Sequence, residues 1–395
     1  MKALIGFAML ACLAHAESYR FGRVWDGERV WTNAVIVVEG DRIKSIGPSD
    51  SAAIDKSRFT ALPGLIDVHT HMTYVLDMSG IAGSARGAAT VWMSQENIRK
   101  TLETGVTTVR DLGASNYADI AMRDLINTGR MIGPRMFVAG YGLSIPRGTR
   151  TTPGTARGAE AVAKVVRAQV DAGADVIKVY GSTGSGRDVT GDQTFTFEEL
   201  KAAVDTAHEL KKRIAVHSYG PAGARDAIRA GADSIEHATD MDDETIAELV
   251  RRKVFYVPTI DHNRYYVDNA TLLRYPPGAT DGLNAFIARN LETAKRAYKA
   301  GARFAMGSDA VYTMFGENTR ELAWFVKAGM TPEASLRTAT VDGAALLGME
   351  DKLGRLKPGY FADIVAVEGN PLEDINVVIQ RVRWVMKGGA VVVGR

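Results

Sequence analysis

The stretch from Gly64 to Met72, GLIDVHTHM, places two histidines one residue apart at the end of an apolar, strand-like run. Along a β-strand, residues i and i+2 point to the same face, so His69 and His71 would be directed toward the same place. Imidazole nitrogens are good ligands for zinc and similar divalent ions. The spacing therefore predicts a pair of metal ligands.

Other chemically capable residues end similar β-branched runs. His217 lies near the end of RIAVHSYG and His237 near the end of ADSIEHA, while Asp309 follows the run RFAMGS. Two more imidazoles and a carboxylate would complete a site for a divalent ion with open positions for water and substrate. Lys178, in ADVIKVY, is different because an ammonium group cannot bind a cation. It would need conversion by carbon dioxide to a carbamate, or it is a salt-bridging lysine at a strand end.

The elements that must position these residues form a repeating pattern. Between about Phe59 and Leu347, eight strand-like runs alternate with amphipathic stretches, and helices are predicted over residues 159–172, 197–211 and 243–252. Strand, helix and strand at this spacing require parallel pairing, and eight such units close into a (β/α)8 TIM barrel. Active sites of that fold lie at the carboxyl ends of the strands, where the candidate ligands fall.

Two long connections are expected to overhang this end of the barrel: residues 141–155 after the third strand and residues 261–280 after the seventh. The first contributes Arg147 as a candidate substrate-binding residue, and the second contributes His262 and Arg264. Tyr219 lies two residues after His217 and shares its face if the strand persists.

The two ends of the chain have a different character. Residues 34–48 read as a β-hairpin, and residues 362–370 and 382–393 have the same β-branched composition. We expect both ends to pair into one small composite β-sandwich domain, formed by residues 17–60 and 354–395, beside a barrel domain of residues 61–353.

Composition limits the function further. The chain has 395 residues, is 46% hydrophobic and carries a formal net charge of +2, which indicates neither nucleic acid nor an anionic membrane as a partner. Residues 1–16 have a basic start, a short apolar core and an Ala-x-Ala end, as a secretory signal peptide does. The alternative is a buried first strand. An exported protein, periplasmic or secreted, would lose its only cysteine, Cys12, on cleavage after Ala16, which excludes thiolate chemistry.

Taken together, these motifs resemble those of a known family. The sequence is similar to the amidohydrolase superfamily, in the branch of imidazolonepropionase-related amidohydrolases, Xaa-Pro and Xaa-Arg/Lys dipeptidases (prolidase-like) and ochratoxin-hydrolysing enzymes. The motifs that carry the resemblance span nearly the whole chain after residue 16: LPGLIDVHTH, GVTTVRDLG, GPRMFVAG, GADVIKVY, AVHSYG, GADSIEHA, MGSDA and LGRLKPGYFADIVAVEGNPLEDI.

The resemblance implies a binuclear centre of two divalent metal ions, with zinc expected. One ion would be held by His69, His71 and Asp309, and the other by His217 and His237. Carbamylated Lys178 and a hydroxide would bridge the two ions. Asp309 would be the catalytic proton shuttle, and Tyr219 a catalytic or substrate-contacting residue, with a core or rim tyrosine as the alternative.

The sequence departs from many relatives after the third strand. Where they carry a Gly-Gly-His segment, this chain reads Ser144-Ile145-Pro146-Arg147-Gly148-Thr149. Arg147 or Arg150 could bind a substrate carboxylate in a bidentate fork, or both could belong to a solvated basic loop.

The expected function is hydrolysis of the amide bond in dipeptides or N-acyl amino acids, small substrates that suit an exported scavenging enzyme. A cyclic amide hydrolase of the imidazolonepropionase type and a deaminase are the alternatives. The residues His217-Ser218-Tyr219 disfavour deamination, because deaminases of the superfamily usually carry a glutamate shortly after this histidine. A non-catalytic metal-binding barrel is the third reading, and a homo-oligomer is left open.

Overall fold

The computed structural model describes residues 16–48, 52–76, 87–146, 148–149, 151–186 and 188–394. The predicted signal segment therefore lies outside the described residues except for Ala16, and so do Arg147 and Arg150.

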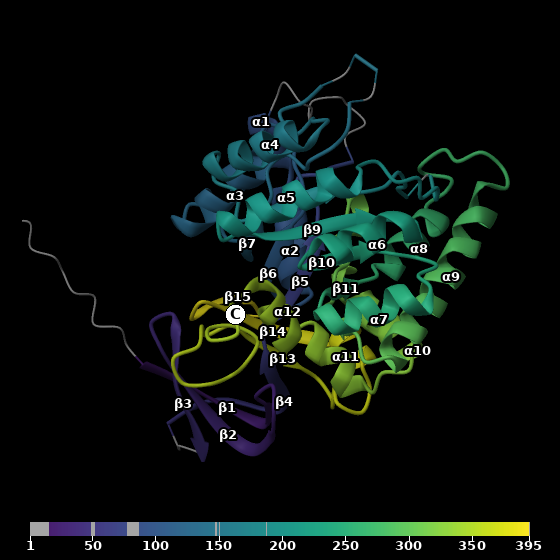
Figure 1. Ribbon diagram of the computed structural model, residues 1–395. Coiled ribbons are helices and arrows are strands. Elements are labelled where there is room, and N and C mark those ends of the chain that lie inside the picture. Colours follow the sequence, from purple (N-terminus) through teal and green to yellow (C-terminus); the bar gives the residue numbers. More distant parts are fainter. Residues whose placement is uncertain are drawn as a thin grey trace, which may run out of the picture.

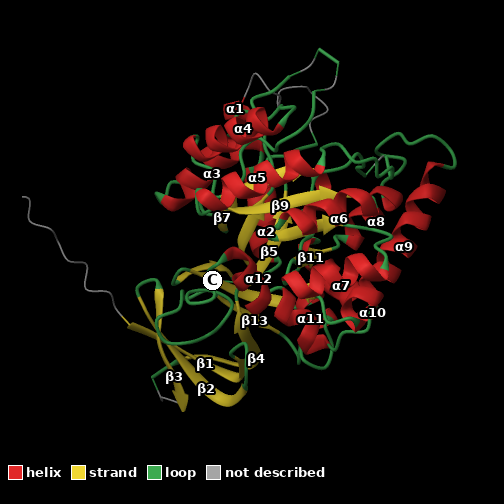
Figure 2. Ribbon diagram, viewed as in Figure 1, coloured by secondary structure: helices red, strands yellow, loops and turns green. Residues whose placement is uncertain are grey.

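Eight parallel strands form the centre of the molecule (Figures 1 and 2). They are β5 (Leu65–Thr70), β6 (Val106–Asp111), β7 (Arg135–Val138), β8 (Val176–Tyr180), β9 (Arg213–Ser218), β10 (Ser234–His237), β11 (Phe255–Val257) and β12 (Arg303–Phe304). β5 to β7 pair in one sheet and β8 to β12 in another, each in sequence order. Bridges between Leu143 and Val179 and between Thr70 and Ala310 join the two sheets at both edges. The strands therefore close into the predicted barrel.

A buried aspartate fixes one of these two closures. Asp67 on β5 accepts hydrogen bonds from the amide and hydroxyl of Ser308 at 2.9 and 2.6 Å, and from the side-chain amide of Asn318 at 3.0 Å. The amide of Asp309 donates to the carbonyl of His69 at 2.7 Å. These bonds hold the segment after β12 against β5, which brings Asp309 beside the two histidines of GLIDVHTHM.

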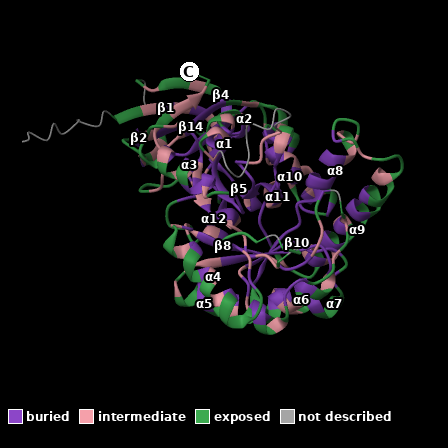
Figure 3. Ribbon diagram, turned by 90° about the horizontal axis from the view of Figure 1, so that it is seen from above, coloured by how far each residue is buried: buried purple, intermediate pink, exposed green. Residues whose placement is uncertain are grey.

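Helices surround the barrel, and most cover its outer face. They are α1 (Gly87–Met93), α2 (Gln95–Glu103), α3 (Ala118–Asn127), α4 (Ala159–Asp171), α5 (Phe197–Glu209), α6 (Pro221–Ala230), α7 (Asp243–Arg252), α8 (Ile260–Asp268), α9 (Ala279–Lys299), α10 (Glu321–Lys327), α11 (Pro332–Thr338) and α12 (Val341–Leu347), with the short 3-10 helices η1 (Tyr312–Met314) and η2 (Asn318–Arg320). Helices α8 and η1 contribute instead to the cavity at the carboxyl ends of the strands. Figure 3 shows the expected amphipathic pattern, with buried residues toward the strands and exposed residues outside.

Both ends of the chain contribute to one seven-stranded sheet beside the barrel. Its order is β15-β14-β13-β4-β1-β2-β3. The strands are β1 (Ala16–Trp25), β2 (Val30–Glu39), β3 (Arg42–Pro48), β4 (Ile54–Pro63), β13 (Ile364–Val367), β14 (Val382–Lys387) and β15 (Ala390–Val393), with helix α13 (Asn376–Gln380) between β13 and β14. Its core includes Phe21, Ile36 and Trp384. The predicted fold class, a barrel with a composite β domain, is confirmed, while the domain boundaries stay predictions.

The chain passes directly from this sheet into the barrel through Gly64. A Cβ atom there would lie 2.2 Å from the hydroxyl oxygen of Thr107 and 2.8 Å from the Cβ of Asp363, so a larger residue would clash. This close approach sets β5 against the sheet. None of the described helices has the length and apolar character needed to cross a bilayer.

Candidate active site

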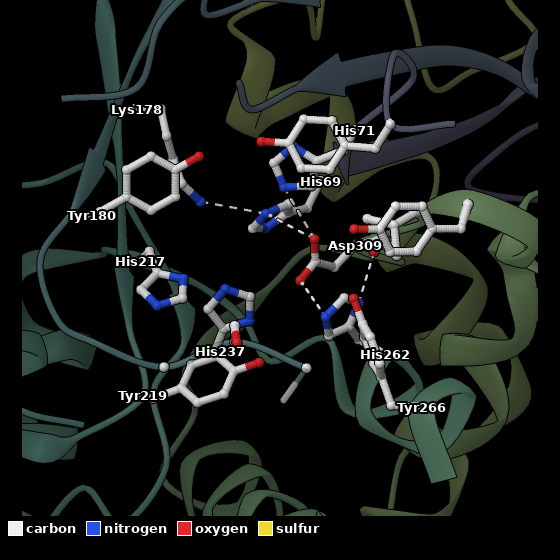
Figure 4. A pocket seen from close by; sticks show the side chains of 16 residues that line it. His69, His71, Lys178, Tyr180, His217, Tyr219, His237, His262, Tyr266 and Asp309 are labelled. Carbon is white, nitrogen blue, oxygen red and sulfur yellow. Dashed lines mark hydrogen bonds and ion pairs between the residues drawn. The ribbon is translucent and has the colours of Figure 1, made fainter. Parts of the chain in front are cut away.

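The structure brings all the sequence-predicted metal ligands to one cavity of about 250 Å³ at the carboxyl ends of the barrel strands. Figure 4 shows their side chains converging on a common centre. They come from β5 and the residue after it, β8, β9, β10 and the segment after β12, and each is less than 10% exposed. The set is His69, His71, Lys178, His217, His237 and Asp309.

Three of the four histidines have one ring nitrogen within hydrogen-bond distance of another protein group. Nδ1 of His69 lies 2.8 Å from Glu236, Nδ1 of His71 lies 3.3 Å from the carbonyl oxygen of Gly113, and Nδ1 of His237 lies 2.6 Å from a threonine hydroxyl. Contacts of this kind fix the ring orientation and direct the other nitrogen into the cavity.

Burial keeps His69, His217 and His237 neutral, as metal ligands must be. Desolvation, together with the nearby Lys178 ammonium, lowers the pKa of His69 to about 4. Burial likewise holds the pKa values of His217 and His237 well below the usual range for histidine. A neutral imidazole offers a lone pair to a cation, which a protonated ring cannot do.

Lys178 is almost completely buried, and its Nζ lies 3.4 Å from Nε2 of His69. Burial lowers its pKa to about 8. About a tenth of this amine is therefore unprotonated at pH 7, far more than for an ordinary lysine, and only the unprotonated amine can react with carbon dioxide.

Asp309 is the carboxylate of the site. Its Oδ1 lies 3.2 Å from Nε2 of His71 and 3.5 Å from Nε2 of His69, and its Oδ2 lies 3.3 Å from Nε2 of His262. Burial alone would raise the pKa of Asp309, but these three imidazoles hold it well below its usual range. The carboxylate is therefore ionised and directed into the cavity.

The site also carries backbone strain. His237 and Asp309 have φ angles of 71° and 52°, in the left-handed region that non-glycine residues rarely adopt. Such strain costs on the order of 1–3 kcal/mol per residue and concentrates at functional sites.

The residues present fit a divalent metal centre. Ligand atoms of His69, His71 and Asp309 lie within 4.8 Å of one another. Nε2 of His217 is buried and has no hydrogen-bond partner among the described residues, an orphan that a cation would satisfy.

Tyrosines form much of the cavity wall. Tyr219 stacks on His217 with ring centroids 5.0 Å apart, and Tyr74 stacks on His71 at 4.5 Å. Tyr180, Tyr266 and Tyr312 also line the cavity. Only Tyr219 was singled out from the sequence. Tyr180 lies two residues after Lys178 and Tyr266 four after His262, so strand and helix periodicity could have found both.

Two of the predicted substrate contacts need correction or stay untested. Arg264 does not line the cavity, because its guanidinium pairs with Asp261 at 2.9 Å and with Asp268 and Glu317 at 2.5 Å.

His262 does line the cavity, but its ring contacts Asp309 rather than open space. The segment after the seventh strand is not simply a loop, since it begins with helix α8. Arg147 lies outside the described residues.

Comparisons with known proteins agree with this architecture. A model of the amidohydrolase family matches residues 60–392. An ochratoxinase of Aspergillus niger is 32% identical over 92% of this chain and 83% of its own length. An imidazolonepropionase of Streptomyces coelicolor is 28% identical over 85% of both chains.

Solved structures give the same grouping. A Xaa-Pro dipeptidase crystallised with methionine in its active site superposes with a TM-score of 0.87 at 31% identity, over 95% of this chain and 99% of that one. A prolidase in complex with N-methylphosphonate-L-proline has a TM-score of 0.87 at 27% identity, over 96% and 100% of the two chains.

Proposed function

The chain belongs to the amidohydrolase family of hydrolases, and on that premise we propose that it cleaves the amide bond of dipeptides or N-acyl amino acids. The observation that carries the proposal is the position of Asp309, an ionised carboxylate held among imidazoles in a cavity sized for a small substrate. The relatives that cleave Xaa-Pro dipeptides support the choice of substrate class.

We propose that two divalent ions are held here, one by His69, His71 and Asp309 and the other by His217 and His237, with Lys178 carbamylated between them. Bound ions of this kind polarise a substrate carbonyl and lower the pKa of a water molecule. Zinc suits the nitrogen and oxygen ligands.

Asp309 moves the proton in this proposal. Its carboxylate accepts a proton from the attacking water and returns it to the nitrogen of the departing amine, as a general base and then a general acid. Nδ1 of His262 donates to the carbonyl oxygen of Asp309 at 2.8 Å, which fixes the imidazole beside Oδ2. His262 therefore holds the Asp309 carboxylate in position for proton transfer.

The tyrosine hydroxyls supply hydrogen bonds for the substrate. Tyr219 is the candidate of first choice, because its ring is fixed between His217 and Phe286, at centroid distances of 5.0 and 4.7 Å. A fixed phenol can bind a carbonyl or carboxylate oxygen with little loss of side-chain entropy.

The test is release of free amino acid from a library of dipeptides and N-acyl amino acids, with zinc-loaded protein and with a chelator. Release from a defined subset that the chelator abolishes would support the proposal and identify the preferred C-terminal residue. Silence across the library, with zinc shown to be bound, would contradict it and favour cyclic amides, which the imidazolonepropionase relatives suggest.

The assignment of Lys178 has its own measurement. Lys178→Ala should lower the zinc content per chain below that of the wild type, since a carbamate on this side chain would be lost. Equal zinc content in the two proteins would remove Lys178 from the metal centre.

A further inference from the structure

A buried ion pair lies directly behind one of the proposed metal ligands. Arg110 on β6 and Glu236 on β10 are 1% and 0% exposed, inside the barrel. Oε1 of Glu236 lies 2.9 Å from Nη2 of Arg110, and Oε2 lies 2.8 Å from Nδ1 of His69. The three side chains form one chain of contacts that crosses from β6 through β10 to β5.

This arrangement needs an explanation beyond stability. Apolar residues usually fill a barrel interior, and replacing a buried ion pair by apolar side chains is often neutral or stabilising. Here each side-chain nitrogen of Arg110 and each carboxylate oxygen of Glu236 has a hydrogen-bond partner instead. Nε of Arg110 donates to the carbonyl of Val68 at 2.5 Å, and Nη1 donates to the hydroxyl of Ser234 at 3.0 Å.

These bonds leave Glu236 a single orientation. Its Oε1 accepts from both Arg110 and Ser234, so Oε2 can only face His69. An ionised carboxylate accepts hydrogen bonds and cannot donate them. Nδ1 of His69 must therefore carry the proton, and Nε2 keeps its lone pair toward the cavity.

We propose that Arg110 and Glu236 are positioning residues that select the metal-binding tautomer of His69. The inference rests on the proposed function, because it assumes that a metal ion is bound at Nε2 of His69. The role of Arg110 is to fix the Glu236 carboxylate so that Oε2, a hydrogen-bond acceptor, faces the imidazole of His69. Outer contacts of this kind typically change metal affinity or activity by roughly 10–100-fold.

Glu236→Gln tests the proposal with almost no change of shape. Arg110 can only donate, so the amide oxygen of the new side chain turns toward Arg110 and its NH2 group turns toward Nδ1 of His69. Nδ1 then becomes an acceptor and the proton moves to Nε2. Zinc affinity, measured by competition with a chromophoric chelator, should fall roughly 10–100-fold.

The double variant Arg110→Met with Glu236→Gln separates tautomer selection from simple loss of a charge. Without Arg110, the amide can turn its oxygen to His69 and its NH2 group to Ser234. We expect the double variant to bind zinc more tightly than Glu236→Gln alone. An affinity equal to or below that of the single variant would overturn the assigned role of Arg110.

Asp363→Asn is the matched control. Asp363 is a buried carboxylate paired with Arg135 at 3.3 Å, and it accepts from the amide of Gly388 at 2.7 Å, at the junction of barrel and sheet. Its loss should lower the melting temperature of the metal-free protein without changing zinc affinity. An equal affinity loss in Asp363→Asn and Glu236→Gln would show a general effect of destabilisation and overturn the proposal.

The remaining outcomes are also decisive. Wild-type affinity in Glu236→Gln, or a wild-type protein that binds no zinc, would overturn the inference. Zinc binding by the wild type without hydrolysis of any amide would contradict the proposed function, yet the affinities of the variants would still decide the role of Glu236.

Discussion

Asp309 is the residue on which the proposed reaction depends most, because it transfers the proton. It combines an ionised carboxylate, a strained backbone and contacts with three imidazoles. Asp309→Asn should retain at least one metal ion, because the histidines remain, while turnover falls on the order of 10²–10⁴-fold, as expected for loss of a general acid and base. Steady-state kinetics with metal analysis on the same samples would check this, and a fully active variant would refute the shuttle.

Tyr219 presents a hydroxyl to the substrate, and Tyr219→Phe removes only that oxygen while keeping the ring stack. Loss of one hydrogen bond should lower kcat/KM roughly tenfold. Tyr265→Phe is a suitable control, because the Tyr265 hydroxyl pairs with Thr313 at 2.8 Å and does not line the cavity. An unchanged kcat/KM in Tyr219→Phe, or an equal loss in both variants, would remove Tyr219 from substrate binding.

For single residues, the sequence predicted those site positions that follow from the regular spacing of side chains along one strand. The two-residue spacing of His69 and His71 is visible in the chain itself, and the same rule applied to Lys178 would have found Tyr180. The contact between His262 and Asp309 could not be predicted in this way, because closure of the barrel joins segments 47 residues apart.

Among the elements, helix α8 has the most direct influence on the site, since it carries His262 and Tyr266. Its first turn is capped by a buried carboxylate on another helix: Glu321 accepts from the amides of Ile260 and Asp261 at 2.9 and 2.8 Å. Burial raises the pKa of Glu321 to about 8, despite these two bonds.

The raised pKa predicts a pH effect on stability. Because the folded-state pKa exceeds the unfolded value of about 4.5, the contribution of Glu321 is complete below that value and is lost as pH rises through about 8. Glu321→Gln should therefore gain stability relative to the wild type between about pH 5 and pH 8.5, in chemical denaturation. A constant difference across this range would contradict the prediction.

Element lengths were predicted less well than element types. β12 comprises only Arg303–Phe304, and Asp309 lies beyond it. Its amide donates to the carbonyl of His69, and the preceding Ser308 is held by Asp67, so no continuous ladder is needed. Helix α8 was expected to be part of a loop, because several of its nine residues are polar. In the structure Asp261 and His262 are buried, and they contact Trp324 and Asp309 instead of solvent. Neither feature has a local signal strong enough to show it.

For the whole molecule, the proposed ions would join strands from around the barrel. A ligand that binds only the folded chain stabilises it by about 4 kcal/mol when its concentration is a thousand times its Kd. Zinc should therefore raise the melting temperature by several degrees, and a chelator should reverse the shift. A melting temperature insensitive to both, in calorimetry, would contradict a metal centre that spans the barrel.

The order of strands in the composite sheet has a consequence for how the chain reaches its native state. β4 pairs with β13 in the register Pro63 to Ile364, so the middle of the sheet joins parts of the chain about 300 residues apart. Contacts of such long sequence separation form slowly. We expect β4 to keep an exposed edge until the barrel is complete, and its amides to gain protection late in pulse-labelling hydrogen exchange. Protection of β4 before the barrel strands would contradict this order of assembly.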